Sequence, residues 1–218
     1  MDDTEIGDIL DESPNNWGRW GDDDEIGALN FLTAAEVLRG AASVERGKTF
    51  TLGIPISSGA PEPVTPKRGM SAHHYMKRDQ GHYLSGKADA SQSGEIASAD
   101  DVVYLFIQGA THFDGLGHVW HDNRMYNGYD ADSTMGGLEV CSIRPIAERG
   151  VAGRGILLDI ARHRGVSHLE DGERITLDEL KTCADSQDTD IHQRDILFLR
   201  TGWIESFYQA GEPLEDFN

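Results

Sequence analysis

The segment from Gln108 to His121, QGATHFDGLGHVWH, places three histidines, one aspartate and three glycines directly after an apolar run. His112 and Asp114 are two residues apart, so in an extended segment both side chains point to the same side. Imidazole nitrogen and carboxylate oxygen suit zinc, manganese or iron(II), and so few protein ligands leave positions free for water and substrate. The spacing predicts a divalent metal site, with a purely structural polar network as the alternative.

Two further residues of this segment are candidates for chemistry. Gln108 lies four residues before His112 and can offer a carbonyl oxygen to the same ion, although amides are weak ligands. His118 follows Asp114 by four residues across two glycines, which let the backbone fold tightly. Neutral imidazole can take a proton from an activated water and return it to a leaving group near neutral pH. His118 is therefore the candidate proton carrier.

The charge balance excludes several classes of partner. Asp and Glu number 38 against 19 Lys and Arg, which gives a formal charge of −19, so nucleic acid and anionic membranes are poor partners. The basic residues comprise 5 Lys and 14 Arg, and Asp exceeds Glu by 23 to 15. This bias suits a surface that stays hydrated at high salt, so we hypothesise a halophilic source, with an ordinary acidic protein as the alternative.

Hydropathy and cysteine content indicate a soluble globular protein. No apolar run approaches the roughly 20 residues of a membrane-spanning helix. The N-terminus, MDDTEIGDILDES, has neither the basic start nor the apolar core of a secretion signal, so we expect a cytoplasmic protein. Cys141 and Cys183 are not spaced as a zinc pair or a redox motif, and we expect both to be reduced and packed.

The elements that must position the candidate residues alternate between strands and helices. Capping-box pairs, Thr33 with Glu36 and Thr176 with Glu179, predict two helix starts, and a short turn or helix is expected over 143–148. Apolar runs predict strands over 49–56, 102–107, 155–160 and 195–200. We therefore predict an α/β protein with a mixed β-sheet and flanking helices, in which the early strands can pair antiparallel.

The remaining segments read as loops or arms. Residues 1–16 are polar and acidic, and we expect a mobile arm there, with a single domain over 17–218. Residues 17–32, with two tryptophans and an acidic cluster, read as a shaped loop. Residues 57–99 are rich in Gly, Ser, Pro, Lys and Asp, which predicts a long loop.

These residues resemble the signature of the cyclase and kynurenine-formamidase family, H-x-G-T-H-x-D-x-P-x-H. Thr111, His112, Asp114 and His118 fall on its T, second H, D and last H. The signature's first H, its G and its P are replaced by Gln108, Ala110 and Leu116. NWGRWGDDDEIGALNFLT, DDVVYLFIQGATHFDGLGHV, MYNGY, GILLDIARHRG and DILFLRTGW, in this order, are similar to the longer branch of the family and cover most of residues 13–208.

The resemblance implies a swivelling β/β/α fold and a metal-dependent hydrolase of a small amide, formamide or lactam, acting on C–N bonds as arylformamidases do. In that family the first H, second H and D bind a divalent ion, most often zinc or manganese, and the last H transfers protons. By position this implies Gln108, His112 and Asp114 as ligands and His118 as general acid and base. The alternatives are a lactonase, cyclase or dehydratase on the same site, or a binding paralogue without catalysis.

The resemblance also bears on substrate contacts and assembly. It brings His74 over the pocket, and Trp20 is either a pocket wall that stacks on an aromatic substrate or a core plug. The family usually continues past the RTGW strand with a further His and Glu of the metal site, whereas this chain stops at Asn218. We therefore expect a homodimer or homotetramer. Four other histidines are interpreted as solvated: His82, His163, His168 and His192.

Overall fold

The structure is a computed structural model that describes residues 13–54, 73–77, 100–104, 106–109 and 111–205, with the backbone alone at 73–77 and 100–104. The chain divides into two compact units. The first comprises Met1–Thr49 and Phe113–Gly202, and the second comprises Phe50–His112 and Trp203–Asn218. The expected single domain over 17–218 stays a prediction, and residues 1–12 of the expected arm lie outside the described residues.

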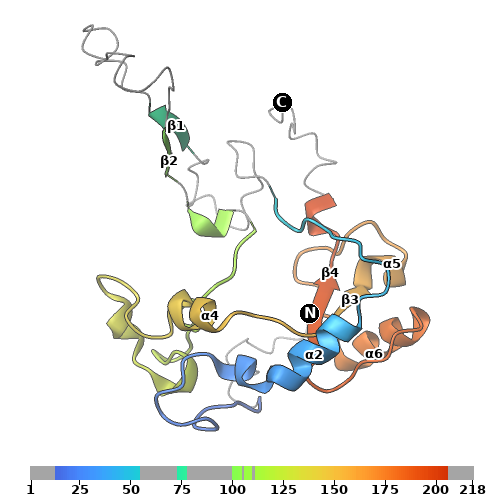
Figure 1. Cartoon of the computed structure of the whole chain (residues 1–218), viewed down its shortest axis with the longest axis horizontal. Coiled ribbons are helices and arrows are strands. Elements are labelled where there is room, and N and C mark those ends of the chain that lie inside the picture. Colours follow the sequence, from blue (N-terminus) through green and yellow to red (C-terminus); the bar gives the residue numbers. More distant parts are fainter. Residues whose placement is uncertain (1–12, 55–72, 78–99, 105, 110, 206–218) are drawn as a thin grey trace, which may run out of the picture. The chain divides into compact units, whose positions relative to one another are not determined.

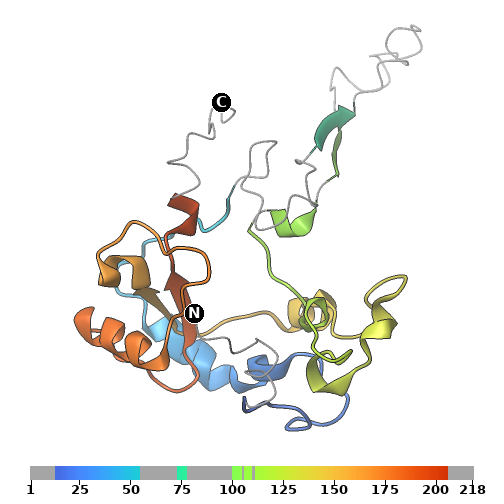
Figure 2. The same ribbon diagram turned by 180° about the vertical axis from the view of Figure 1, so that it is seen from behind.

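A parallel pair of strands forms the centre of the first unit. β3 (Gly155–Asp159) pairs with β4 (Ile196–Arg200) in a register that runs from Gly155 beside Ile196 to Asp159 beside Arg200. α5 (Ile160–Arg164) follows β3 directly, and α6 (Leu177–Ser186) packs on β3 (Figures 1 and 2). The predicted α/β class and both of these strands are confirmed.

The core of the first unit lies between the sheet and α6. Because strand side chains alternate, Ile156 and Leu158 of β3 face the same way, and both are buried. Leu180, Cys183 and Ala184 have the spacing of one helix face and pack against them. Both cysteines are buried free thiols, as predicted. Thr176 caps α6 by accepting a hydrogen bond from the Glu179 N–H at 3.2 Å.

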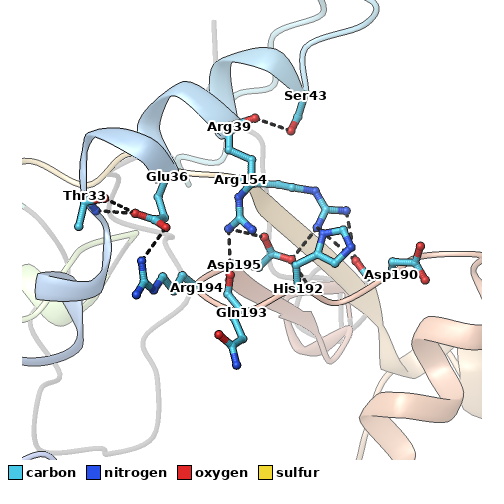
Figure 3. A network of polar contacts seen from close by, with 10 residues as sticks. All are labelled: Thr33, Glu36, Arg39, Ser43, Arg154, Asp190, His192, Gln193, Arg194 and Asp195. Carbon is cyan, nitrogen blue, oxygen red and sulfur yellow. Dashed lines mark hydrogen bonds and ion pairs between the residues drawn. The ribbon is translucent and has the colours of Figure 1, made fainter.

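α2 (Ala34–Ala42) begins with the predicted capping box. The Glu36 carboxylate accepts hydrogen bonds from the Thr33 N–H and hydroxyl, and it also pairs with Arg194 at 3.0 Å. One turn later, Arg39 forms an ion pair with the buried Asp195, also at 3.0 Å (Figure 3). Charges on one face of α2 therefore fasten the helix to the segment that leads into β4.

Asp195 is the centre of this network. Its side chain is 2% exposed, and it accepts hydrogen bonds from Arg154 at 2.6 Å and from the His192 N–H at 2.8 Å (Figure 3). Since Arg154 directly precedes β3 and Asp195 directly precedes β4, the pair ties the starts of both strands together. A buried carboxylate with two arginines and a backbone donor has its charge compensated.

The rest of the first unit consists of short helical turns and one further helix. α4 (Ile143–Arg149) confirms the predicted short helix and is capped by Ser142. The turns are 3-10 helices: η1 (Gly27–Phe31), η5 (Leu116–His118), η6 (Tyr126–Gly128) and η7 (Ala131–Thr134). One of them, η5, ends at the candidate residue His118.

The second unit contains an antiparallel pair. β1 (His73–Lys77) pairs with β2 (Asp100–Tyr104), with His73 beside Tyr104 and Lys77 beside Asp100. β1 lies inside the long loop predicted over 57–99, so that segment contains a strand that the sequence analysis did not predict. β2 ends earlier than the predicted strand over 102–107, because Ile107 begins η4 (Ile107–Gly109).

The predicted strand over 49–56 is wrong for its described part, since residues 49–54 form no ladder. The Thr111 side chain, instead of a partner strand, forms hydrogen bonds to this backbone. Its hydroxyl accepts one from the Ile54 N–H at 2.8 Å and donates one to the Leu52 carbonyl at 3.2 Å. Within the described ranges, no helix combines the length and apolarity needed to cross a membrane.

Candidate functional site

His118 ends a tight turn built on two glycines. Its N–H donates to the Gly115 carbonyl at 3.2 Å, and the Gly117 N–H donates to the Cys141 carbonyl at 2.8 Å. A Cβ on Gly115 would lie 2.6 Å from the Ser142 carbonyl carbon, closer than any real side-chain contact. The backbone therefore turns tightly, as the glycines predicted, and it approaches the 141–142 segment more closely than a larger residue at position 115 would allow.

Cys141 braces this turn from the other side. Its N–H donates to the Glu25 carboxylate at 2.5 Å, and its backbone has a φ of 54°, in the left-handed region that non-glycine residues rarely adopt. Burial, reinforced by the nearby Glu25 charge, raises the pKa of the Cys141 thiol to about 11. The thiol is thus protonated near neutral pH, and its part in the site is structural rather than nucleophilic.

A second set of contacts joins the loop over residues 17–25 to η6. The Tyr126 hydroxyl donates to Asp24 at 2.7 Å, and Asp24 also accepts from the Gly27 N–H at 2.9 Å and from Asn30 at 2.6 Å. Burial alone would raise the pKa of Asp24, but the hydrogen bonds from Tyr126 and Asn30 outweigh it and lower the pKa. Burial and the Asp24 carboxylate raise the pKa of Tyr126 in turn, so this pair stays an ionised acceptor and a neutral donor.

The Asn127 side chain forms hydrogen bonds to the backbone of the tryptophan-rich loop, residues 17–25. The amide oxygen accepts from the Gly18 N–H at 2.7 Å, and the amide nitrogen donates to the Gly21 and Asp22 carbonyls at 3.0 Å each. Its own backbone has a φ of 60°, a conformation that asparagine tolerates better than most residues. The stretch 17–25 is therefore a shaped loop, as predicted, and the MYNGY fragment shapes it. The rest of the loop predicted over 17–32 is corrected, because it contains the 3-10 helix η1 (Gly27–Phe31).

Two of the three predicted metal ligands, Gln108 and His112, lie in the second unit. Gln108 is half-buried in η4, and His112 is exposed. The intervening Thr111 is fastened to residues 52–54 by the two hydrogen bonds described above. The signature threonine therefore fixes the backbone directly before His112.

The candidate residues are divided between the two units, whose boundary falls between His112 and Phe113. Gln108 and His112 belong to the second unit, whereas Asp114 and His118 are exposed side chains of the first. Among the described residues, no three His, Cys, Asp or Glu side chains are grouped as metal ligands. The donor chemistry of His112, Asp114 and Gln108 nevertheless suits zinc or manganese, with two strong ligands and one weak ligand from one short segment.

Trp20 lies in the acidic loop with its ring edge against Phe31, at a centroid distance of 4.9 Å and an interplanar angle of 80°. The Arg19 guanidinium lies over both rings, 5.5 Å from the Trp20 centroid and 4.7 Å from that of Phe31. The indole thus packs locally while staying partly exposed. His74 is in β1, and its side chain lies outside the described residues. Substrate contact by either residue stays a prediction.

Sequence reasoning did not identify Glu25, Tyr126 or Cys141 as supports of the His118 turn. Glu25 and Cys141 are 116 residues apart in the chain, and Tyr126 and Asp24 are 102 apart, so no local spacing relates them. One available signal was the Asn127–Gly128 dipeptide, a strong marker of a tight turn.

Comparisons with known proteins identify the family of the chain. The model of the Cyclase family matches residues 50–217. A crystal structure described as that of a novel cyclase superposes with a TM-score of 0.76 at 36% sequence identity. That alignment covers 90% of this chain and 65% of the solved one, so the chain spans less than two thirds of that protein. No curated protein matches the chain. On the family match and the solved relative together, the chain belongs to the cyclase family.

Proposed function

We propose that this protein is a metal-dependent hydrolase of a small amide, formamide or lactam, with His118 as general acid and base. The observation that carries the proposal is the order Thr111, His112, Asp114, His118 in a cyclase-family chain, with His118 placed at the end of a turn that has no room for a Cβ. A proton carrier is most effective when its position is fixed, because misplacement costs rate steeply.

Gln108, His112 and Asp114 are the residues proposed to hold the ion. When bound there, zinc or manganese would supply Lewis acidity, which lowers the pKa of water toward neutrality and polarises a carbonyl. Two strong ligands from one segment are few for a stable site, so the proposal includes further donors beyond these three. The replacement of the signature's first histidine by Gln108 predicts weaker affinity for the ion than a histidine would give.

His118 is proposed to move the proton. Its imidazole is exposed, whereas Gly117 next to it is buried, so the ring meets solvent or substrate while its backbone is packed. Imidazole can accept a proton from the attacking water and deliver it to the leaving nitrogen near neutral pH. The braces through Glu25 and Cys141 keep the backbone of this turn in place during that transfer.

For the substrate, we propose an aryl group beside the scissile C–N bond. Trp20 is a partly exposed indole held by Phe31 and Arg19, and an indole face can stack on an aromatic ring. His74 is proposed as a second contact on the strength of the family resemblance. The protein is further proposed to work in the cytoplasm as a homodimer or homotetramer.

The test combines metal analysis of the purified protein with a panel of N-formyl arylamines, lactams and lactones. We expect a stoichiometric divalent ion and turnover of the formamides or lactams. Turnover of lactones alone would replace the proposal by a lactonase on the same site. Absence of both a bound ion and turnover would show a binding paralogue instead.

Three variants separate the proposed roles. Asp114→Ala should lose the ion and all hydrolysis, whereas His118→Ala should keep the ion and slow the chemical step by roughly a hundredfold to ten-thousandfold. His168→Ala is the matched control, because that ring contacts Ser167 and Glu170, away from the 108–118 segment in sequence. Loss of the ion in His118→Ala would make His118 a ligand and contradict its assignment as proton carrier.

A further inference from the structure

A cavity of about 680 Å³ opens at the carboxyl end of β3 in the first unit, outside the 108–118 segment. It is lined by Leu157, Asp159, Arg162, His163, Ser186 and Gln187. Pockets that hold small organic ligands in proteins have volumes of about 300–1,000 Å³. The carboxyl ends of parallel strands are also where α/β folds bind their ligands. We propose that this cavity binds a small carboxylate whose anionic group meets Arg162 and whose apolar group lies on Leu157.

Hydrogen bonds within the protein order the part of the cavity wall formed by Gln187 and β3. The Gln187 side chain donates from Nε2 to the Leu157 carbonyl at 2.8 Å and accepts at Oε1 from the Asp159 N–H, also at 2.8 Å. These two backbone groups lie on the edge of β3 away from β4, so the amide takes the place of a neighbouring strand. Because the wall is already ordered, ligand binding does not have to order it.

The acidic lining residue is already engaged by donors of the protein. The Asp159 carboxylate accepts from Arg200 at 2.8 Å and from the Arg162 N–H at 3.0 Å. Burial alone would raise the pKa of Asp159, but these two donors outweigh it and lower the pKa. The carboxylate is therefore ionised and forms its ion pair with Arg200, whereas the Arg162 guanidinium acts on it through its charge without an ion-pair contact.

Arg162 supplies the charge that a carboxylate would meet. Its side chain is exposed and lines the cavity. Within the part of the chain that the structure describes, no hydrogen bond or ion pair holds its guanidinium. By contrast, the neighbouring Arg164 is engaged by Glu173 and Glu179 at 2.9 and 2.5 Å. An arginine beside a cavity whose guanidinium is not engaged in hydrogen bonds among the described residues can give a carboxylate two parallel hydrogen bonds.

His163 lies beside Arg162 in the cavity lining and contacts two hydroxyls of α6. Its Nδ1 lies 3.2 Å from the Ser186 hydroxyl and its Nε2 lies 3.4 Å from the Thr182 hydroxyl. Both hydroxyls already donate their single proton, Ser186 to the Cys183 carbonyl and Thr182 to the Glu179 carbonyl. The two hydroxyls thereby hold the imidazole ring in the wall of the cavity.

Leu157 supplies the apolar contact. It is 57% exposed on the face of β3 opposite the core residues Ile156 and Leu158. A ligand that carries an aryl or alkyl group beside its carboxylate would cover this surface, whereas an inorganic oxyanion would leave it in water. The lining thus favours an organic carboxylate over phosphate and over a neutral apolar molecule.

The test is calorimetric titration of the full chain with benzoate, benzyl alcohol and inorganic phosphate. Saturable one-site binding of benzoate is expected, at least tenfold tighter than either of the others. Arg162→Gln should weaken benzoate binding by about 10- to 100-fold, the loss of a charge-assisted hydrogen-bonded pair. The matched control is Arg144→Gln, whose guanidinium pairs with Glu148 on the surface of α4 and should leave benzoate binding unchanged.

A second variant tests the apolar contact independently. Leu157→Thr keeps a strand-forming residue at an exposed position, so it should fold normally while weakening benzoate but not acetate. Equal binding of benzyl alcohol, equal binding of phosphate, absence of saturable binding of benzoate, or a normal affinity in Arg162→Gln would each overturn the proposal.

Discussion

Replacing Gly115 by Ala isolates the close approach on which the His118 turn depends. The φ of Gly115 is −71° with a ψ of 155°, a conformation that alanine adopts freely. In open space this substitution would stabilise the protein by about 0.4–1 kcal/mol, because alanine restricts the unfolded chain. Any loss of stability must therefore come from the native contacts of the new Cβ.

Those contacts are severe and involve backbone only. The Cβ would lie 2.6 Å from the Ser142 carbonyl carbon and 2.7 Å from both the Cys141 oxygen and the Ile143 nitrogen. Carbon contacts are comfortable at about 3.5 Å, so the turn must move away by roughly 0.9 Å. Overpacking of this kind costs about 1–3 kcal/mol. Relative to a Gly→Ala change in open space, we therefore expect a loss of about 1–3 kcal/mol in the free energy of unfolding and, if His118 transfers protons, a fall in kcat.

The assay is urea denaturation followed by far-UV circular dichroism, with Gly53→Ala as the matched control. A Cβ added to Gly53 would meet no atom of the described residues within 4 Å, and the φ of Gly53 is not left-handed, so its replacement should be neutral or slightly stabilising. A Gly115→Ala protein as stable as the Gly53→Ala protein would refute the packing of the turn against 141–143, and with it the reason given for the glycines.

Three further outcomes are expected. Gly40→Ala in α2 should destabilise the protein, because the new Cβ would lie 2.5 Å from the Gly153 carbonyl, although alanine is the better helix former. A higher melting temperature of this variant would contradict the prediction. Hydrogen bonds from Thr33 and then Arg194 lower the pKa of Glu36 to about 2 from its ordinary 4.5, so its stabilisation is complete above about pH 4.5 and is lost as pH falls toward 2. Glu36→Gln should flatten acid denaturation in that window. Light scattering should give a mass of two or four chains, and a monodisperse monomer of 24.0 kDa would exclude the proposed oligomer.

The sequence predicted those elements whose causes are local. The capping box at Thr33 involves residues three apart, and the apolar runs around 155–160 and 195–200 needed no knowledge of their neighbours. Partner choice was not local. HHYMK (73–77) became β1 because β2 pairs with it, and 49–54 formed no ladder because the Thr111 side chain satisfies two of its backbone groups.

The candidate site shows the same division. The chemistry of His112, Asp114 and His118 could be inferred from residue type and spacing within one short segment. What holds that segment could not, since the contacts of Cys141 with Glu25 and Gly117 join parts of the chain that no periodicity relates. A family resemblance pointed to the right fragments, but only the structure shows that MYNGY acts through its asparagine on the tryptophan-rich loop.

The β3–β4 pair shows why composition alone misjudges exposure. α6 covers the face that carries Ile156 and Leu158, whereas Leu157 and Phe198 on the opposite face are 57% and 43% exposed. Parallel strands are normally covered on both faces. Gln187 already engages the Leu157 carbonyl and the Asp159 N–H on the edge of β3 away from β4, so a further strand adds more readily at β4. Cover for Leu157 and Phe198 has to come from a surface laid over the sheet, and a carboxylate ligand with an apolar group would supply part of it.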